Sequence, residues 1–217
     1  MQEKITINTQ SSIRIESEKV IYFDPFKIEK ETHDADFVFI THDHYDHFEL
    51  DSLKKVMNDN TLVIIPDSMF LKVVPYMNQK QVRGVVPNED YVINGLSFST
   101  IPSYNLNKNF HPRSSNFVGY LLDIEDQKVL VTGDTDKTPE LLNVKCDIAF
   151  VPIGGTYTMD YKEAAEAINH IKPTLVIPTH FGSIVGNKTD ANKFAELLDS
   201  DIECINKLDW LIWIKKE

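Results

Sequence analysis

The sequence predicts an α+β fold of four layers, in which two β-sheets face each other between outer helices. This αββα sandwich is expected to form from residues 1–217 as a single domain. Many short β-rich runs precede the first strong helical pattern, and several later strands are continuous apolar runs, which is typical of strands covered on both faces. With 42% hydrophobic residues, the chain can bury a core without disulfide bonds.

The first third of the chain begins with strands. In residues 4–10 and 12–17, isoleucines alternate with polar residues, which indicates antiparallel strands with one exposed face. Residues 19–26 and 35–42 are further strand-like runs, and the second ends at a cluster of histidines and aspartates. A helix over 50–57 follows, because leucine, valine and methionine recur there at helical spacing.

The middle of the chain returns to strands separated by turn residues. Asn94-Gly95 predicts a tight hairpin turn, and residues 125–127 form a polar turn between two apolar runs. Together with the earlier runs, these segments supply the strands for two sheets. They lie at 61–67, 81–86, 91–95, 96–103, 116–124 and 128–134.

The last third alternates strands and helices. A helix over 160–171 begins at a capping box formed by Asp160 and Glu163, and a shorter helix is expected over 191–200. The expected strands lie at 146–155 and 174–180, with strand-like runs at 202–208 and 209–216.

The charge balance limits the partners of this protein. The 22 lysines and arginines against 33 aspartates and glutamates give a net charge of -11, which disfavours nucleic acid and suits a small-molecule substrate. No apolar run approaches the roughly 18 residues of a membrane span, and the two cysteines lack zinc or redox spacing and are expected to be buried thiols. We therefore expect a cytoplasmic protein without a membrane partner, and the sequence carries no signal for an oligomeric state.

Polar side chains collect at the ends of apolar strands. The runs at 37–42 and 175–180 both end in Thr-His, and the run at 128–134 ends at Asp134. Because the carboxyl ends of such strands meet at one edge of a sheet, these residues are expected to line one open rim.

The stretch THDHYDH after the strand at 35–42 predicts a metal site. Residues two apart in an extended chain face the same way, so His42 and His44 can reach one ion together. The helix that follows requires a turn, and this turn would direct Asp46 and His47 toward a second ion. Imidazole and carboxylate ligands without thiolate favour zinc, with manganese or iron as alternatives. The competing interpretation is a polar loop or helix cap.

This stretch resembles the HxHxDH motif of the metallo-β-lactamase superfamily, and VTGDT, IPTHFG and YFDPF resemble further segments of it. The chain looks most like its branch of small metal-dependent hydrolases, related to ascorbate-phosphate lactonase. The resemblance implies the αββα fold and two divalent metal ions, zinc first. It assigns His42 and His44 to the first ion, Asp46, His47 and His180 to the second, and Asp134 as a bridge. It also offers Asp24 as a hydrogen-bond partner of a metal-binding histidine.

The usual histidine of the first site is missing from its place. The superfamily usually carries it shortly after a strand such as LSFSTIPS, where this chain has Ser103-Tyr104-Asn105. His111, in the following loop, could supply the third ligand. Alternatively, His111 faces the substrate while Tyr104 or a water fills the gap.

The resemblance implies hydrolysis of an ester, lactone, thioester, amide or phosphodiester by water activated between two cations. Asp46 would orient this water and accept its proton. Lys108 and Arg113 are candidates to meet an anionic group of the substrate, or are solvated loop charges. Two alternatives stay open: a metal-binding protein without turnover, and a redox diiron relative, which would be expected to replace His44 by glutamate and to add a flavin domain.

Overall fold

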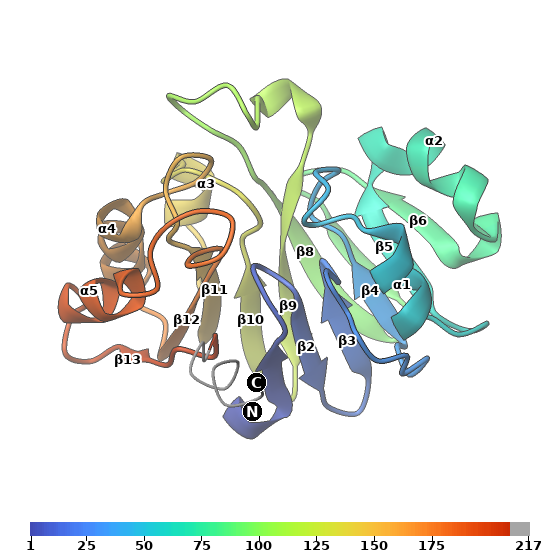
Figure 1. Ribbon diagram of the computed structural model, residues 1–217, viewed down its shortest axis with the longest axis horizontal. Helices are drawn as coiled ribbons and strands as arrows, with labels where there is room; N and C mark the ends of the chain where they lie inside the picture. Colours follow the sequence, from blue (N-terminus) through green and yellow to red (C-terminus); the bar gives the residue numbers. More distant parts are fainter. Residues whose placement is uncertain (209–217) are drawn as a thin grey trace.

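The computed structural model describes residues 1–208, and its elements form the four layers that the sequence predicts (Figure 1). Two β-sheets pack face to face, and helices cover the outer face of each sheet. The predicted α+β sandwich is therefore confirmed. The strand-like run at 209–216 lies outside the described residues.

The first sheet contains the six amino-terminal strands in sequence order. Its first three strands pair antiparallel, as the alternation of isoleucines predicts, and the remaining strands join in parallel. The strands are β1 (Ile5–Ile7), β2 (Ile13–Glu16), β3 (Val20–Phe23), β4 (Phe37–Phe39), β5 (Leu62–Pro66) and β6 (Val82–Val85).

In the described part of the chain, the second sheet has seven strands, in the order β13-β12-β11-β10-β9-β8-β7. Its strands are β7 (Asp90–Ile93), β8 (Leu96–Pro102), β9 (Val118–Ile124), β10 (Gln127–Val131), β11 (Ile148–Pro152), β12 (Leu175–Thr179) and β13 (Glu203–Cys204). Both predicted hairpins form: Asn94 and Gly95 turn between β7 and β8 with positive φ, and Glu125 and Asp126 do the same between β9 and β10. From β10 to β13 the strands are parallel.

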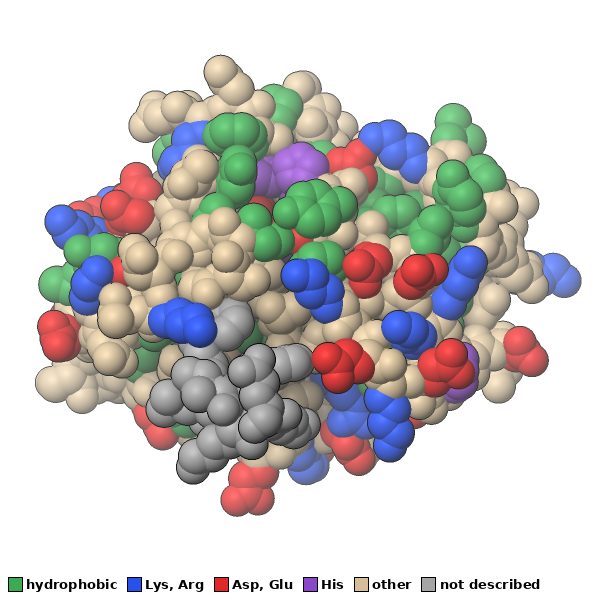
Figure 2. Space-filling model, in the orientation of Figure 1, with side chains coloured by type: hydrophobic (Ala, Val, Ile, Leu, Met, Phe, Trp, Pro, Cys, Tyr) green, Lys and Arg blue, Asp and Glu red, His purple; other side chains and the backbone are tan. Residues whose placement is uncertain are grey.

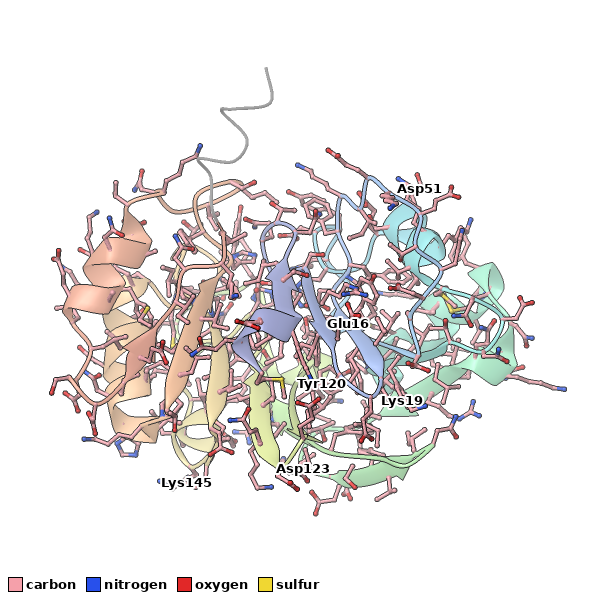
Figure 3. All side chains as sticks on the ribbon, turned by 90° about the horizontal axis from the view of Figure 1, so that it is seen from below. Glu16, Lys19, Asp51, Tyr120, Asp123 and Lys145 are labelled. Carbon is pink, nitrogen blue, oxygen red and sulfur yellow. The ribbon has the colours of Figure 1, made fainter. Side chains whose placement is uncertain are left out.

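The core between the sheets is aromatic at its centre. The ring of Phe39 in β4 lies 5.1 Å from that of Phe98 in β8 and 4.9 Å from that of Tyr120 in β9, both edge-on. Figure 3 labels Tyr120 near the middle of the molecule, viewed from below. Its hydroxyl donates to the carbonyl oxygen of Ile40 at 2.7 Å, so even this buried polar group is satisfied and holds the sheets together next to the histidine cluster.

Short helices cover the outer faces. The first sheet is covered by α1 (Leu50–Val56) and α2 (Phe70–Val73), and the second by α3 (Pro139–Leu142), α4 (Tyr161–Ile171) and α5 (Asp190–Glu196). Sequence periodicity missed α2 and α3, since four residues are too few to show a helical repeat. Within residues 1–208, five 3₁₀ turns complete the elements, at Gln2–Lys4, Asp67–Met69, Val74–Tyr76, Gln79–Gln81 and Arg113–Ser115.

Helix α4 begins as its sequence predicts. The side chain of Asp160 accepts hydrogen bonds from the backbone N–H groups of Lys162 and Glu163, and the Glu163 carboxylate accepts one from the N–H of Asp160. Its buried alanine and isoleucine face packs on the second sheet. Helix α4 therefore anchors the strands that lead to Asp134 and His180.

The two cysteines differ in part from what the composition predicts. Cys146 and Cys204 are free, as expected, but both are only half-buried, which corrects the prediction of buried thiols. Burial nevertheless raises their thiol pKa values to about 12 and about 11, respectively. Across residues 1–208, the structure contains no helix with the length and apolar character needed to cross a bilayer.

Candidate metal centre

Seven predicted or candidate ligands meet at one edge of the sandwich, where β4, β10 and β12 end. They form three overlapping groups, and within each group the ligand atoms lie within 4.8 Å of one another. The groups are His42, His44 and His111; His42, His47 and Asp134; and Asp46, His47 and His180. The structure thus gathers all six residues that the motif assigned, and adds His111; their role as ligands stays a prediction.

His42, His44 and His111 form the first donor group, which consists of three imidazoles. Nε2 of His111 lies 3.3 Å from Nε2 of His42 and 3.1 Å from Nδ1 of His44. His42 follows β4 directly, His44 lies in the turn that leads to α1, and His111 comes from the connection between β8 and β9. Of the two options for His111, its geometry fits that of a third ligand.

Asp46, His47 and His180 form the second donor group, which combines imidazole and carboxylate and has Asp134 beside it. Nε2 of His180 lies 3.3 Å from Oδ2 of Asp46 and 3.2 Å from Oδ2 of Asp134. Nε2 of His47 lies 3.8 Å from Oδ2 of Asp46 and 3.3 Å from Oδ1 of Asp134. Ligands about 2.1 Å from a tetrahedral ion would lie about 3.4 Å from one another, so these spacings match an ion at the centre.

Buried atoms without hydrogen bonds support the same interpretation. Within residues 1–208, Nε2 of His47 and Oδ1 of Asp134 find no hydrogen-bond partner, although both are fully buried. The two atoms lie 3.3 Å apart, but their alignment is wrong for a hydrogen bond. An unsatisfied buried group costs about 1–3 kcal/mol, and a divalent cation between these atoms would remove that cost. The donor set therefore fits a metal ion.

The electrostatics of the cluster also favour a cation. Burial opposes a positive charge on His47, but the carboxylates of Asp134 and Asp24 raise its pKa well above the usual value. Burial likewise opposes charge on Asp134, yet His180 and His47 lower its pKa well below that of a free aspartate. Burial and the neighbouring His47 lower the pKa of His42, and burial lowers that of His111 to about 4. His42, His111 and Asp134 thus favour the neutral imidazole and ionised carboxylate forms that bind metal, whereas the carboxylates around His47 favour a positive charge that a bound cation would supply in place of its proton.

Asp24, which follows β3, orients two histidines of the cluster through hydrogen bonds. Its Oδ2 accepts from Nδ1 of His47 at 2.7 Å and from Oγ1 of Thr41 at 2.7 Å, while Oδ1 accepts from the backbone N–H of Thr41. Because the Thr41 hydroxyl donates to Asp24, it accepts from Nδ1 of His42 at 3.0 Å. Both histidines thus turn Nε2 toward the cluster, which is the role predicted for Asp24.

The backbone is strained where it presents ligands. His180 has φ 55° and Asp24 has φ 44°, a left-handed conformation that costs about 1–3 kcal/mol for most residues. Gly133, before Asp134, has φ 64°, and a Cβ there would lie 2.9 Å from Cβ of Thr41. At Gly154 a Cβ would collide with the carbonyl oxygen of His180. The packing of β4, β10 and β12 holds these positions in place.

The hydroxyl of Tyr104 binds a glutamate outside the first donor group. Its hydroxyl donates to Oε2 of Glu140 at 2.9 Å, and the guanidinium of Arg113 lies 4.9 Å from its ring. The side chain is thus engaged in a separate contact, which favours His111 over Tyr104 as the replacement for the missing histidine. Its backbone instead pairs with Asp136, which fixes the start of the loop that carries His111.

Sequence reasoning missed Gln10. This buried residue lies in the turn between β1 and β2, and its Nε2 approaches Oδ2 of Asp46 at 3.5 Å. Its carbonyl oxygen accepts from the backbone N–H of His180 at 3.2 Å. The run Asn8-Thr9-Gln10-Ser11 has the composition of a solvated turn, so no local signal in the sequence distinguished Gln10.

The rim around the cluster is apolar. Figure 2 shows histidine side chains reaching the surface beside hydrophobic ones. Tyr45 lies within the histidine motif. The ring of Phe110, next to His111, packs in a T-shaped arrangement with the ring of Tyr157, with the ring centroids 4.6 Å apart. The exposed rim side chains are Tyr45 (66%), Leu106 (51%) and Phe110 (45%).

Three cations near this rim form ion pairs with carboxylates of the chain. Lys108 lies 2.6 Å from Oδ1 of Asp136, and Arg113 lies 2.5 Å from Oε1 of Glu140. Lys72, in α2, pairs with the carboxylate of Asp43. Lys108 and Arg113 therefore serve internal contacts, which weakens their candidacy as anchors for an anionic substrate.

Comparison with known proteins agrees with this architecture. Residues 4–180 match the model of the beta-lactamase superfamily domain. The chain is 26% identical over 217 residues to a UPF0173 metal-dependent hydrolase of Thermococcus onnurineus, covering 93% of this chain and 95% of that protein. The crystal structure of a metal-dependent hydrolase from Parabacteroides distasonis has a TM-score of 0.80 and 25% identity, covering 94% of this chain and 93% of that one.

A more distant structure shares the fold alone. CmlA, a diiron beta-hydroxylase from Streptomyces venezuelae, has a TM-score of 0.74 and 13% identity, covering 94% of this chain and 52% of that one.

The sandwich, the donor groups at its edge and these relatives together define a metal-dependent hydrolase. The chain belongs to the beta-lactamase superfamily, within the metallo-β-lactamase fold.

Proposed function

We propose that this protein binds two divalent cations, zinc being the first choice, and uses them to hydrolyse an ester, lactone or thioester bond in a small substrate. The observation that carries the proposal is the position of Asp134 between the two donor groups. Its Oδ1 lies 3.3 Å from Nε2 of His47, and its Oδ2 lies 3.2 Å from Nε2 of His180 and 3.7 Å from Nε2 of His111. One carboxylate would thus serve both ions.

When bound, the cations would supply Lewis acidity that lowers the pKa of a water and polarises the bond to be cleaved. His42, His44 and His111 would hold one ion, and Asp46, His47 and His180 the other, with Asp134 shared.

Asp46 is the proton acceptor in this proposal. Gln10 and His180 approach its Oδ2, whereas its Oδ1 has no hydrogen bond within residues 1–208. Burial opposes its ionisation, but the hydrogen bond from His180 lowers its pKa below the usual value. Asp46 is therefore an ionised carboxylate with one oxygen able to take a proton from water.

The rim favours a carbonyl substrate over a phosphodiester. Tyr45, Leu106 and Phe110 present apolar surface, and the rim cations Lys72, Lys108 and Arg113 are paired with carboxylates. A neutral substrate with an apolar group meets this surface without displacing an ion pair. Specificity in such a site comes from the few groups that contact the substrate beyond the reacting atoms.

The test is turnover by purified protein loaded with zinc or manganese, with metal content measured by elemental analysis. We expect two ions per chain and hydrolysis of p-nitrophenyl esters, lactones or thioesters in preference to bis-p-nitrophenyl phosphate. Asp46→Ala should lower kcat by about 10²- to 10⁴-fold. Asp43→Asn, which changes a carboxylate of the same motif that pairs with Lys72, is the matched control and should retain activity.

Two other results would replace the proposal. Two bound ions without turnover on any of these substrates would favour a metal-binding protein. Oxygen consumption by the iron-loaded protein would favour a redox role, for which the sequence pattern instead expects glutamate in place of His44.

A further inference from the structure

From the hydrogen bonds around His111, we infer that Asn105 is a positioning residue. It fixes His111 in the tautomer and orientation that complete the first donor group, so that a loop histidine takes the place usually filled beside the end of β8. The inference rests on the proposed two-ion site, and it concerns how this chain builds that site.

Two hydrogen bonds join Asn105 and His111 and close the loop between them. The backbone N–H of Asn105 donates to the carbonyl oxygen of His111 at 2.8 Å, and the backbone N–H of His111 donates to Oδ1 of Asn105 at 3.0 Å. The connection between β8 and β9 rises above both sheets (Figure 1). These two bonds fold its first part back toward the cluster.

The Asn105 side chain can adopt only one orientation. Its Nδ2 donates to Oδ1 of Asp136 at 3.2 Å and to the carbonyl oxygen of Tyr157 at 2.8 Å, and both of these atoms only accept hydrogen bonds. A flipped amide would place oxygen against oxygen at both contacts. Oδ1 of Asn105 therefore faces His111.

This orientation determines where His111 carries its proton. Oδ1 of Asn105 is an acceptor 3.2 Å from Nδ1 of His111, so Nδ1 is the protonated nitrogen. Nε2 is then unprotonated and directs its lone pair toward Nε2 of His42 and Nδ1 of His44, at 3.3 and 3.1 Å. The opposite tautomer would put a hydrogen into the space between the three imidazoles.

The anchor of Asn105 belongs to the same segment as the bridging carboxylate. Asp136 lies two residues after Asp134 and is itself held by the backbone N–H of Leu106 at 2.8 Å and by Nζ of Lys108 at 2.6 Å. The segment after β10 thus supplies the bridge of the metal centre and, through Asn105, the orientation of its loop histidine.

Zinc binding to the full-length protein tests the inference. Zn²⁺ would be titrated into metal-free protein in competition with a chromophoric chelator, for the wild type, Asn105→Ala and Asn109→Ala. Asn105→Ala should weaken one of the two zinc sites by about 10- to 100-fold and leave the other within about threefold. Asn109→Ala changes an exposed asparagine of the same loop and should bind like the wild type. Wild-type binding by Asn105→Ala would overturn the inference, as would equal weakening of both sites.

Two further measurements separate positioning from a general structural role. Because Asn105 acts through His111, adding Asn105→Ala to His111→Ala should change zinc affinity by less than about threefold, whereas a further loss of about tenfold or more would refute the idea. Long-range ¹H–¹⁵N spectra of the metal-free wild type should show His111 with its proton on Nδ1. A proton on Nε2 would overturn the inference even if no Asn105 variant folds.

The outcomes distinguish this inference from the proposed hydrolysis. A wild type that binds two zinc ions without turnover removes the proposed reaction and leaves the role of Asn105 intact. A wild type that hydrolyses substrate while Asn105→Ala keeps both zinc sites removes only the role of Asn105.

Discussion

The variant Asp24→Asn tests the support beneath the cluster most directly. The carboxylate accepts three hydrogen bonds, from the N–H and hydroxyl of Thr41 and from Nδ1 of His47. Whichever way an asparagine amide turns, its NH₂ group faces at least one of these donors. Hydrogen bonds to a charged group contribute about 1.5–3 kcal/mol, and we expect the metal-free variant to lose about that much stability.

The same change should weaken metal binding. Loss of the negative charge makes His47 a weaker ligand and removes the preference for its Nδ1–H tautomer. We expect a 10- to 100-fold loss of zinc affinity, about 1.4–2.7 kcal/mol, measured by chelator competition alongside urea unfolding of the metal-free protein. Asp34→Asn is the matched control, since Asp34 accepts from Arg14 and Tyr22 but from no histidine. Zinc affinity within threefold of the wild type, or an equal loss in the control, would refute the reasoning.

Three further outcomes are expected. Burial lowers the pKa of His111 to about 4 in the folded state, from about 6.5 in the unfolded chain. The unfolded chain therefore takes up the proton first as the pH falls between these values, and the free energy of unfolding of the metal-free protein should fall by on the order of 3 kcal/mol. In urea unfolding, the stability of His111→Gln should depend less on pH over this range. Gly133→Ala should cost about 1–3 kcal/mol more than Gly95→Ala, because both have positive φ but only Gly133 lies against Thr41; equal thermal shifts would contradict this. Tyr104→Phe should leave the zinc stoichiometry unchanged, since its hydroxyl points to a glutamate, and loss of one ion would restore Tyr104 as a ligand candidate.

The sequence predicted most of the fold and six members of the cluster, because these depend on local patterns. Apolar runs that end in His42, Asp134 or His180 define strands whose carboxyl ends meet at one edge. The capping box at Asp160 and the turn at Asn94-Gly95 are likewise local. Helix α2 was not predicted, since its four residues carry no periodic signal.

The remaining members of the site depend on contacts between distant segments. Gln10 meets Asp46 only because the turn after β1 packs under the cluster. The choice between His111 and Tyr104 required the path of the loop after β8, which folds back through hydrogen bonds between side chain and backbone. Such bonds leave no repeat in the sequence, so the sequence could offer both residues but not decide between them.

The candidate ligands differ in how closely their positions are tied to the core. His42, His44, Asp46, His47, Asp134 and His180 follow strands or the turn before α1, and their positions are tied to the core. His111 alone comes from the long loop, and the same loop contributes Leu106 and Phe110 to the apolar rim. A substitution that reshapes this loop for a different substrate would therefore also shift Asn105 and His111, and with them the first donor group. Substrate preference and metal occupancy are thus coupled through this loop, whereas the ligands of the second donor group come from the turn before α1 and from the residues that follow β10 and β12, outside the loop.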